Sequence, residues 1–164
     1  MAKISFFLLL GLLLSGCQSS GDKAVESAGE VPPVELQELP PAVRIDPMAR
    51  EVLDGWPQYQ SLERRMPGLV EAQNEEELKL VLEELDQICE QLEQNAIPEP
   101  FERPSVRSRI KVIRTYLEKL QATLYYRLPY EEPMRELMEA YNALGSQFNV
   151  IVRNTLTPEL FEDE

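Results

Sequence analysis

The chain has 164 residues, 43% of them hydrophobic, which is enough for one ordinary domain with a core beside shorter targeting or linker segments. Twenty-nine acidic residues against sixteen basic ones give a net charge of −13, which lacks the electrostatic footprint of a nucleic-acid-binding protein. The sequence contains no histidine, and this removes every histidine-dependent catalytic triad and zinc site.

The first sixteen residues are predicted to form an export signal. Lys3 supplies a short positive start, and residues 4–14 are almost entirely apolar. Eleven helical residues span roughly 16 Å, about half of a bilayer core, so this stretch is too short to be a stable membrane anchor. Small residues follow at once, as a processing site requires.

The residues that follow this apolar stretch carry a specific motif. Leu14-Ser15-Gly16-Cys17 resembles the lipobox of bacterial lipoprotein signal peptides, in which leucine, a small residue, glycine or alanine, and cysteine follow one another. The resemblance covers only the first 17 residues. It implies that Cys17 receives a diacylglyceryl group, that the signal is cut after Gly16, and that in many bacteria the new amine is acylated too. The alternative is an ordinary secretory signal whose cleavage site lies beside a cysteine.

Acylation at Cys17 predicts how and where the protein is held. Two or three acyl chains, at about 0.8 kcal/mol for each buried CH₂ group, bind a membrane far better than a single chain. Gln18 follows the cysteine, whereas aspartate there resembles an inner-membrane retention signal in enterobacteria, so the outer membrane is favoured. A chain this acidic is repelled by anionic headgroups, and its membrane attachment therefore needs such a hydrophobic anchor.

Residues 17–45 are expected to form a flexible tether behind the acylated cysteine. Paired prolines at Pro32-Pro33 and Pro40-Pro41 favour extended backbone, and the apolar residues show no period of 2 or 3.6. Treated as a coil, a segment of this length has a root-mean-square reach of about 30 Å.

Residues 46–73 predict one or two short helices packed across the main body of the domain. Asp46 and Pro47 suit the cap and the first position of a helix. Pro67-Gly68 interrupts the helical spacing of the apolar residues further on. Trp56 is expected to anchor this segment to the core.

Residues 74–154 are predicted to form an antiparallel three-helix bundle, so the expected fold class is all-α. Asn74 and Glu77 resemble a capping box at the start of the first helix, Ser105 is expected to cap the second, and prolines bracket the turn before the third. Apolar residues recur at steps of three and four, the heptad signature of coiled-coil-like helices that pack at about 20°. The three stripes comprise Leu78, Val81, Leu82, Leu85, Ile88, Cys89 and Leu92, then Val106, Ile110, Ile113, Leu117, Leu120 and Leu124, and finally Met134, Leu137, Tyr141, Leu144, Phe148 and Ile151.

Charge differs sharply between the first and second predicted helices. Residues 75–95 hold eight acidic side chains against one basic, whereas residues 105–127 hold six basic side chains against one acidic. One interpretation is that the two helices lie side by side and their edges attract each other. The other is that Arg107, Lys111 and Arg114, which share one helical face at spacings of four and three, dock an acidic partner.

The remaining candidates for chemistry favour structural roles. Cys89 lies at the flank of an apolar stripe and is expected to be a buried, inert thiol, with a mixed disulfide to a partner as the alternative. Met134 and Met138 lie one turn apart, which suits a soft cation such as Cu(I), but core packing is favoured. The sequence has no glycine-rich phosphate loop, nucleophile elbow or C-x-x-C motif. We expect no metal site, no cofactor and no enzymatic activity.

These features predict an envelope lipoprotein held through Cys17 at the outer membrane and facing the periplasm. Residues 1–16 are the signal peptide, and residues 155–164 form an acidic C-terminal tail. The helical domain is expected to act as a non-enzymatic accessory or adaptor that binds another envelope protein, without a nucleic-acid partner. The alternative is a periplasmic ligand- or metal-binding sensor that uses the interior of the bundle.

Overall fold

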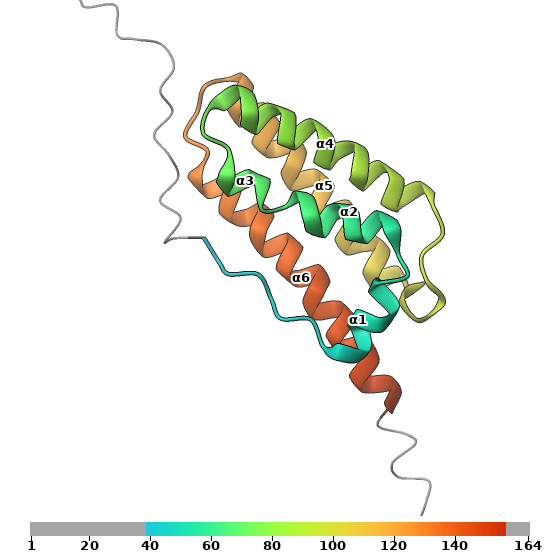
Figure 1. Cartoon of the computed structure of the whole chain (residues 1–164). Coiled ribbons are helices and arrows are strands. Elements are labelled where there is room, and N and C mark those ends of the chain that lie inside the picture. The colour runs from blue at the N-terminus through green and yellow to red at the C-terminus, as the bar shows by residue number, and fades with distance from the viewer. Residues whose placement is uncertain (1–38, 157–164) are drawn as a thin grey trace, which may run out of the picture. The chain divides into compact units, whose positions relative to one another are not determined.

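Helices account for the regular structure between residues 39 and 156, the part of the chain that the computed structural model describes (Figure 1). The elements are α1 (Pro47–Leu53), α2 (Pro57–Arg65), α3 (Gly68–Glu71), α4 (Glu75–Gln94), the 3₁₀ turn η2 (Glu99–Phe101), α5 (Pro104–Tyr125) and α6 (Glu131–Leu156). The expected all-α class is therefore confirmed. None of the described helices is long and apolar enough to cross a membrane. The expected signal peptide, Cys17 and nearly all of the expected acidic tail lie outside the described residues.

The three long helices α4, α5 and α6 follow one another in alternating directions, as Figure 1 shows. Close backbone contacts join α5 to both of its neighbours, but among the described elements α4 and α6 approach each other much less closely. The short helices occupy this gap: α2 and α3 contact α4, and α1 contacts α6. The segment that was expected to lie across a three-helix bundle therefore packs as a fourth unit of the core. We call α1, α2 and α3 together the fourth column.

The starts of the helices follow from local hydrogen bonding. The Asp46 carboxylate accepts a hydrogen bond from Met48 N at 3.1 Å and caps α1, as predicted. At the start of α4, Asn74 Oδ1 accepts from Glu77 N and Glu77 Oε2 accepts from Gln73 N, both at 2.9 Å. These bonds satisfy backbone donors that a first helical turn leaves without partners.

Prolines move two helix starts from their predicted positions. Helix α5 begins at Pro104, so Ser105 lies inside the first turn and is not its cap. Helix α6 begins at Glu131, and Pro133 lies within its first turn, where no helical hydrogen bond is lost because the first N–H groups have no partner inside the helix. The segment before α4 forms three short helices where one or two were expected, because Pro57 and Pro67 each end a run.

Aromatic rings hold the short helices to the core, with Trp56 as the anchor that the sequence suggested. Trp56 is 2% exposed and stacks on Tyr59, with ring centroids 6.0 Å apart. Both rings meet Phe148 of α6 edge-on, and Phe101 of η2 lies 4.6 Å from Phe148, centroid to centroid. Each aromatic side chain buries a large apolar area, and edge-to-face pairs add to that burial. Segments distant in sequence are joined at Phe148.

Residues 39–46, which we call the strap, lie in extended form along α6 (Figure 1). Asn142 of α6 donates to Pro41 O at 2.8 Å and accepts from Val43 N at 2.9 Å. One heptad further on, Asn149 donates to Arg44 O at 2.9 Å and accepts from Asp46 N at 2.7 Å. Each side-chain amide thus satisfies one donor and one acceptor of the strap backbone.

Gly145 lies between these two asparagines and gives the strap room. A Cβ atom at this position would lie 2.5 Å from Val43 Cγ1 and 3.0 Å from Ile45 Cδ1, which is closer than atoms in contact allow. The tether was expected to reach residue 45, but residues 39–45 are packed against α6. Val43 and Ile45 alternate with small or polar residues, as in an extended segment with one apolar side. This alternation is too short to give a clear period of 2 in the sequence.

The asparagine pairs predict a local effect of single substitutions. In Asn142→Ala, the amide proton of Val43 loses its acceptor, and in Asn149→Ala the same happens to Asp46. An unsatisfied polar group of this kind costs about 1–3 kcal/mol, so local opening should become easier. Hydrogen exchange should accelerate at Val43 in the first variant and at Asp46 in the second, and each variant serves as the control for the other. Equal acceleration at both amides in either variant would show that the strap is not held by separate pairs.

Candidate functional site

The three basic residues proposed as a docking stripe lie along α5 but have different surroundings. Arg114 faces α4, where its Nε lies 3.2 Å from Asp86 Oδ1 and its Nη1 lies 3.2 Å from Glu93 Oε2. The negative charge of Asp86 and, to a smaller extent, the hydrogen bond to Glu93 raise the pKa of Arg114 above its ordinary value. This geometry is the pairing of the acidic and basic helices that the charge pattern suggested.

The other two members of the stripe do not reach α4 through ion pairs. Arg107 makes a two-pronged contact with Glu102, just before α5, at 2.7 and 2.8 Å, and the bond lowers the pKa of Glu102. Lys111 is exposed and has no ion pair with any residue between 39 and 156. The three residues of the stripe therefore differ: Arg114 bridges to α4, Arg107 pairs with nearby Glu102, and Lys111 has no ion pair with a described residue.

The sulfur-containing candidates are parts of the core. Cys89 is fully buried, and this burial raises the pKa of its thiol to about 12, so the thiol is protonated and unreactive at neutral pH. Met134 is fully buried, and Met138 is half-buried against the same core. Within the described residues, no group of three histidine, cysteine or acidic side chains has the arrangement of a metal site. Cys17, the predicted lipidation site, lies outside them.

The turn between α5 and α6 carries a surface that the sequence analysis did not single out. We call residues 125–128 the tyrosine turn. The side chains of Tyr125, Tyr126 and Leu128 are 79%, 68% and 56% exposed. The two tyrosine rings meet edge to face with centroids 5.1 Å apart. Apolar side chains this open, and adjacent on one tip, are typical of interaction surfaces.

Backbone hydrogen bonds fix the shape of this turn. Leu128 N donates to Thr123 O and Arg127 N donates to Leu124 O, each at 3.0 Å, which is the Schellman arrangement of a helix end. Such an end needs one residue with a left-handed backbone, and Arg127 supplies it with a φ of 54°. Among residues 39–156 it is the only residue other than glycine with a positive φ. Glycine is the usual residue there because its backbone adopts this conformation without strain.

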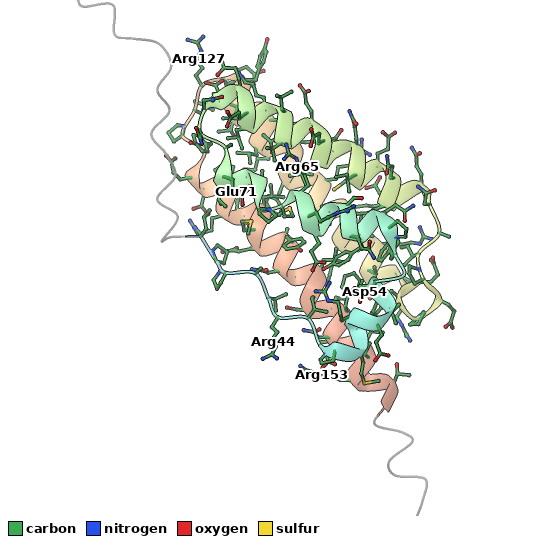
Figure 2. The ribbon with its side chains drawn as sticks, in the orientation of Figure 1. Arg44, Asp54, Arg65, Glu71, Arg127 and Arg153 are labelled. Atoms are coloured by element: carbon green, nitrogen blue, oxygen red, sulfur yellow. The ribbon has the colours of Figure 1, made fainter. Side chains whose placement is uncertain are left out.

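Figure 2 shows where the turn lies in the molecule. Arg127 points away from the helices at the end of the domain where α4 begins and α5 ends. A groove of about 650 Å³ runs beside it between α4 and α5, with Leu82 and Leu124 among its apolar lining. Acidic side chains from both helices border the groove, namely Glu75, Glu83 and Glu118. Lys79 and Arg127 line it as well, so the exposed rings adjoin a groove with an apolar floor and a border of mixed charge.

A sequence signal for the tyrosine turn existed. Leu124 is the last residue of the second apolar stripe, and two consecutive tyrosines follow it. Consecutive residues on a helix point in directions about 100° apart, so both rings cannot enter the core with Leu124. Leu128 then precedes a proline in the connection between α5 and α6, and it belongs to neither of the neighbouring apolar stripes. The open surface follows from this surplus of large apolar side chains beyond the stripe.

The left-handed residue gives a prediction for stability. Arg127→Gly should raise the free energy of unfolding by up to about 1 kcal/mol, because glycine adopts the left-handed backbone without the clash of a Cβ atom. Arg127→Ala removes the same charged side chain but keeps the strain, so it should gain nothing. Urea denaturation of the two variants and the parent separates these effects. A glycine variant no more stable than the alanine variant would show that the left-handed backbone carries no cost.

Comparison of the chain with known proteins does not identify a family. No model of a protein family, no curated protein and no solved structure matches the chain. The function of the chain has to be argued from its own residues and their geometry.

Proposed function

We propose that the chain is a lipid-anchored protein of the bacterial envelope that acts as a non-enzymatic adaptor and binds a partner protein through the tyrosine turn. The anchor rests on the lipobox-like motif that ends at Cys17, and Gln18 favours the outer membrane with the domain facing the periplasm. The docking surface rests on the geometry at the end of α5. The observation that carries the proposal is the exposed pair of rings on a turn that has a left-handed residue and the two hydrogen bonds of a Schellman helix end.

The chemistry of the tyrosine turn suits a protein partner. Tyrosine and arginine are enriched at the energetic centres of protein interfaces, because each offers a large contact area together with polar groups. The Schellman bonds hold the turn in one conformation before binding, so little ordering entropy is lost when a partner docks. Strain at Arg127 places a long cationic side chain where glycine would be less costly, and such strain often accompanies function.

The border of the groove indicates what kind of partner fits. Glu83 is exposed and has no ion pair among the described residues, whereas the exposed Glu118 carboxylate lies 3.6 Å from Arg114 Nε. Glu75 is already paired with Lys79 at 2.5 Å. An apolar segment that carries a lysine or arginine would cover the rings and pair with the free carboxylate of Glu83. We therefore expect a partner segment with an apolar centre and a basic residue at its edge.

The basic stripe is the weaker of the two candidate surfaces. Arg114 and Arg107 already have acidic partners within the domain, and of the three residues only Lys111 has no ion pair with a described residue. A docking partner would have to replace these bonds, which lowers the net gain on binding. The stripe supports pairing of α4 with α5 better than it supports an external contact.

The anchor is tested through the two cysteines of the chain. Cys17→Ala should abolish labelling of the protein by a fatty-acid analogue and leave either uncleaved precursor or protein released from membranes. Cys89→Ala is the matched control, because it removes the other thiol and should label like the parent. Unchanged labelling and membrane partition of Cys17→Ala would refute the anchor.

The docking surface is tested by photo-crosslinking in intact cells. A photoreactive amino acid at Tyr125 or Leu128 should give a discrete crosslinked protein species, whereas the same group at exposed Gln87 on α4 should not. Crosslinks to lipid alone would instead make the turn a membrane contact and refute the protein partner.

Two triple variants then compare the candidate surfaces. Replacing Tyr125, Tyr126 and Leu128 with serine should remove at least nine-tenths of the crosslinked species, measured from a probe at Gln121 beside the groove. Replacing Arg107, Lys111 and Arg114 with glutamine should leave the yield nearly unchanged and lower the melting temperature slightly, mostly at low salt. The reverse pattern would make α5 the docking face and reject the tyrosine turn.

A further inference from the structure

A cavity of about 260 Å³ lies between the strap, α2 and α6, outside the contacts of α4 with α5. Val43 and Ile45 of the strap form its outer wall, and Gly145 of α6 lies in its floor. Folded proteins are packed nearly as densely as organic crystals, and voids of this size are few. An engineered apolar cavity of about 150 Å³ already holds a benzene molecule. The space beneath the strap therefore has the size of a small ligand of one or two rings.

The walls of this cavity combine adaptable apolar groups with a few polar ones. Met66 of α2 and Met138 of α6 line it, and methionine side chains adjust readily to the shape of a ligand. Tyr59, Tyr141 and Glu63 supply the polar groups of the lining. Small-molecule sites have this composition, with mostly apolar walls and a small number of polar groups that set orientation.

The Glu63 carboxylate is held in place from the side. Arg50 of α1 donates to its two oxygens at 2.7 and 2.8 Å, so the carboxylate is fixed and its charge is balanced. Each oxygen retains capacity to accept a further hydrogen bond. A ligand with one N–H or O–H donor matches this wall, whereas an anionic ligand would lose its hydration in a largely apolar space and find no free cation among the described residues that line it.

We propose that the cavity beneath the strap binds a small, uncharged, mainly apolar molecule about the size of indole that carries one hydrogen-bond donor. The strap is the outer wall of the site, and its removal would open the cavity to solvent. This places the ligand beside the bundle and not in its interior, where the sensor alternative had put it. The site is separate from the tyrosine turn and independent of the lipid anchor.

Four methionines make the proposal measurable on the whole mature protein. The ε-methyl groups of Met66 and Met138 line the cavity, whereas Met48 is an exposed residue of α1 and Met134 is not part of the lining. Titration with indole, followed by ¹H–¹³C correlation spectra of ¹³C-methyl methionine, should move the first two signals in a saturable manner. The other two should stay in place. Movement of all four, or of none up to the solubility limit of indole, would overturn the proposal.

Two analogues test the chemistry of the walls. Indole-3-acetate carries the same rings with a negative charge, and 1-methylindole lacks the N–H donor. Indole-3-acetate should bind at least tenfold more weakly than indole, because its carboxylate would lose its hydration among mainly apolar walls whose described residues include no basic one. Weaker binding of 1-methylindole, by several-fold, is expected from the lost hydrogen bond. Equal affinity for all three compounds would show that the polar wall does not select the ligand and would refute the stated ligand class.

A filling variant locates the bound molecule. Val70 lines the cavity and is only half-buried, so Val70→Phe should fill the space and abolish the shifts of both methionine signals. Val112→Phe adds the same volume at an exposed position of α5 and should leave binding unchanged. Circular dichroism checks that both variants fold. If Val70→Phe does not fold, the methionine and analogue titrations of the parent still decide the matter, and persistent shifts in a folded Val70→Phe protein would refute the site.

Discussion

The gap between α4 and α6 is the constraint on which the architecture depends. The two helices both contact α5 closely and leave an open apolar side between them, which α1, α2 and α3 cover. Trp56 and Tyr59 insert into this side and meet Phe148, so large side chains that are buried in the described part of the chain hold the short helices in place. Without that cover, the apolar side chains of α4 and α6 that face this gap would be open to water. The domain thus consists of three long helices and the fourth column, which Pro57 and Pro67 divide into the short helices α1, α2 and α3.

The positions of the other features follow from this packing. The short helices begin with α1 beside α6, and the strap that precedes α1 lies over the same helix, where Asn142 and Asn149 bind its backbone. The cavity arises where strap, α2 and α6 fail to fill the space between them. The tyrosine turn lies at the end of the domain where the aromatic cluster makes no contact, and its shape is set by local hydrogen bonds alone.

The sequence predicted those parts of the fold that depend on local pattern. Steps of three and four placed the three long helices, and Asp46 and Asn74 marked two of the helix starts correctly. Side-chain pairing across the fold was not accessible in this way: nothing near Asn149 in the sequence indicates that it binds residues more than a hundred positions earlier. Charge and spacing predicted both that α4 and α5 could pair and that α5 could carry a docking stripe, but they do not reveal that Arg114 is the stripe residue that pairs with two acids of α4. The tyrosine turn was missed because its residues belong to no periodic pattern.

The direction of the strap has a mechanical consequence. Because the strap runs parallel to α6, any tension transmitted through the chain that precedes residue 39 is applied first to the bonds of Asn142 and only afterwards to those of Asn149. The strap would therefore peel from one end, in two steps separated by the contact of Val43 and Ile45 with Gly145. Since those two side chains form the outer wall of the cavity, the first step would already begin to uncover it. A pull on the N-terminal side of the domain would thus open the cavity beneath the strap, with α6 as the support from which the strap is detached.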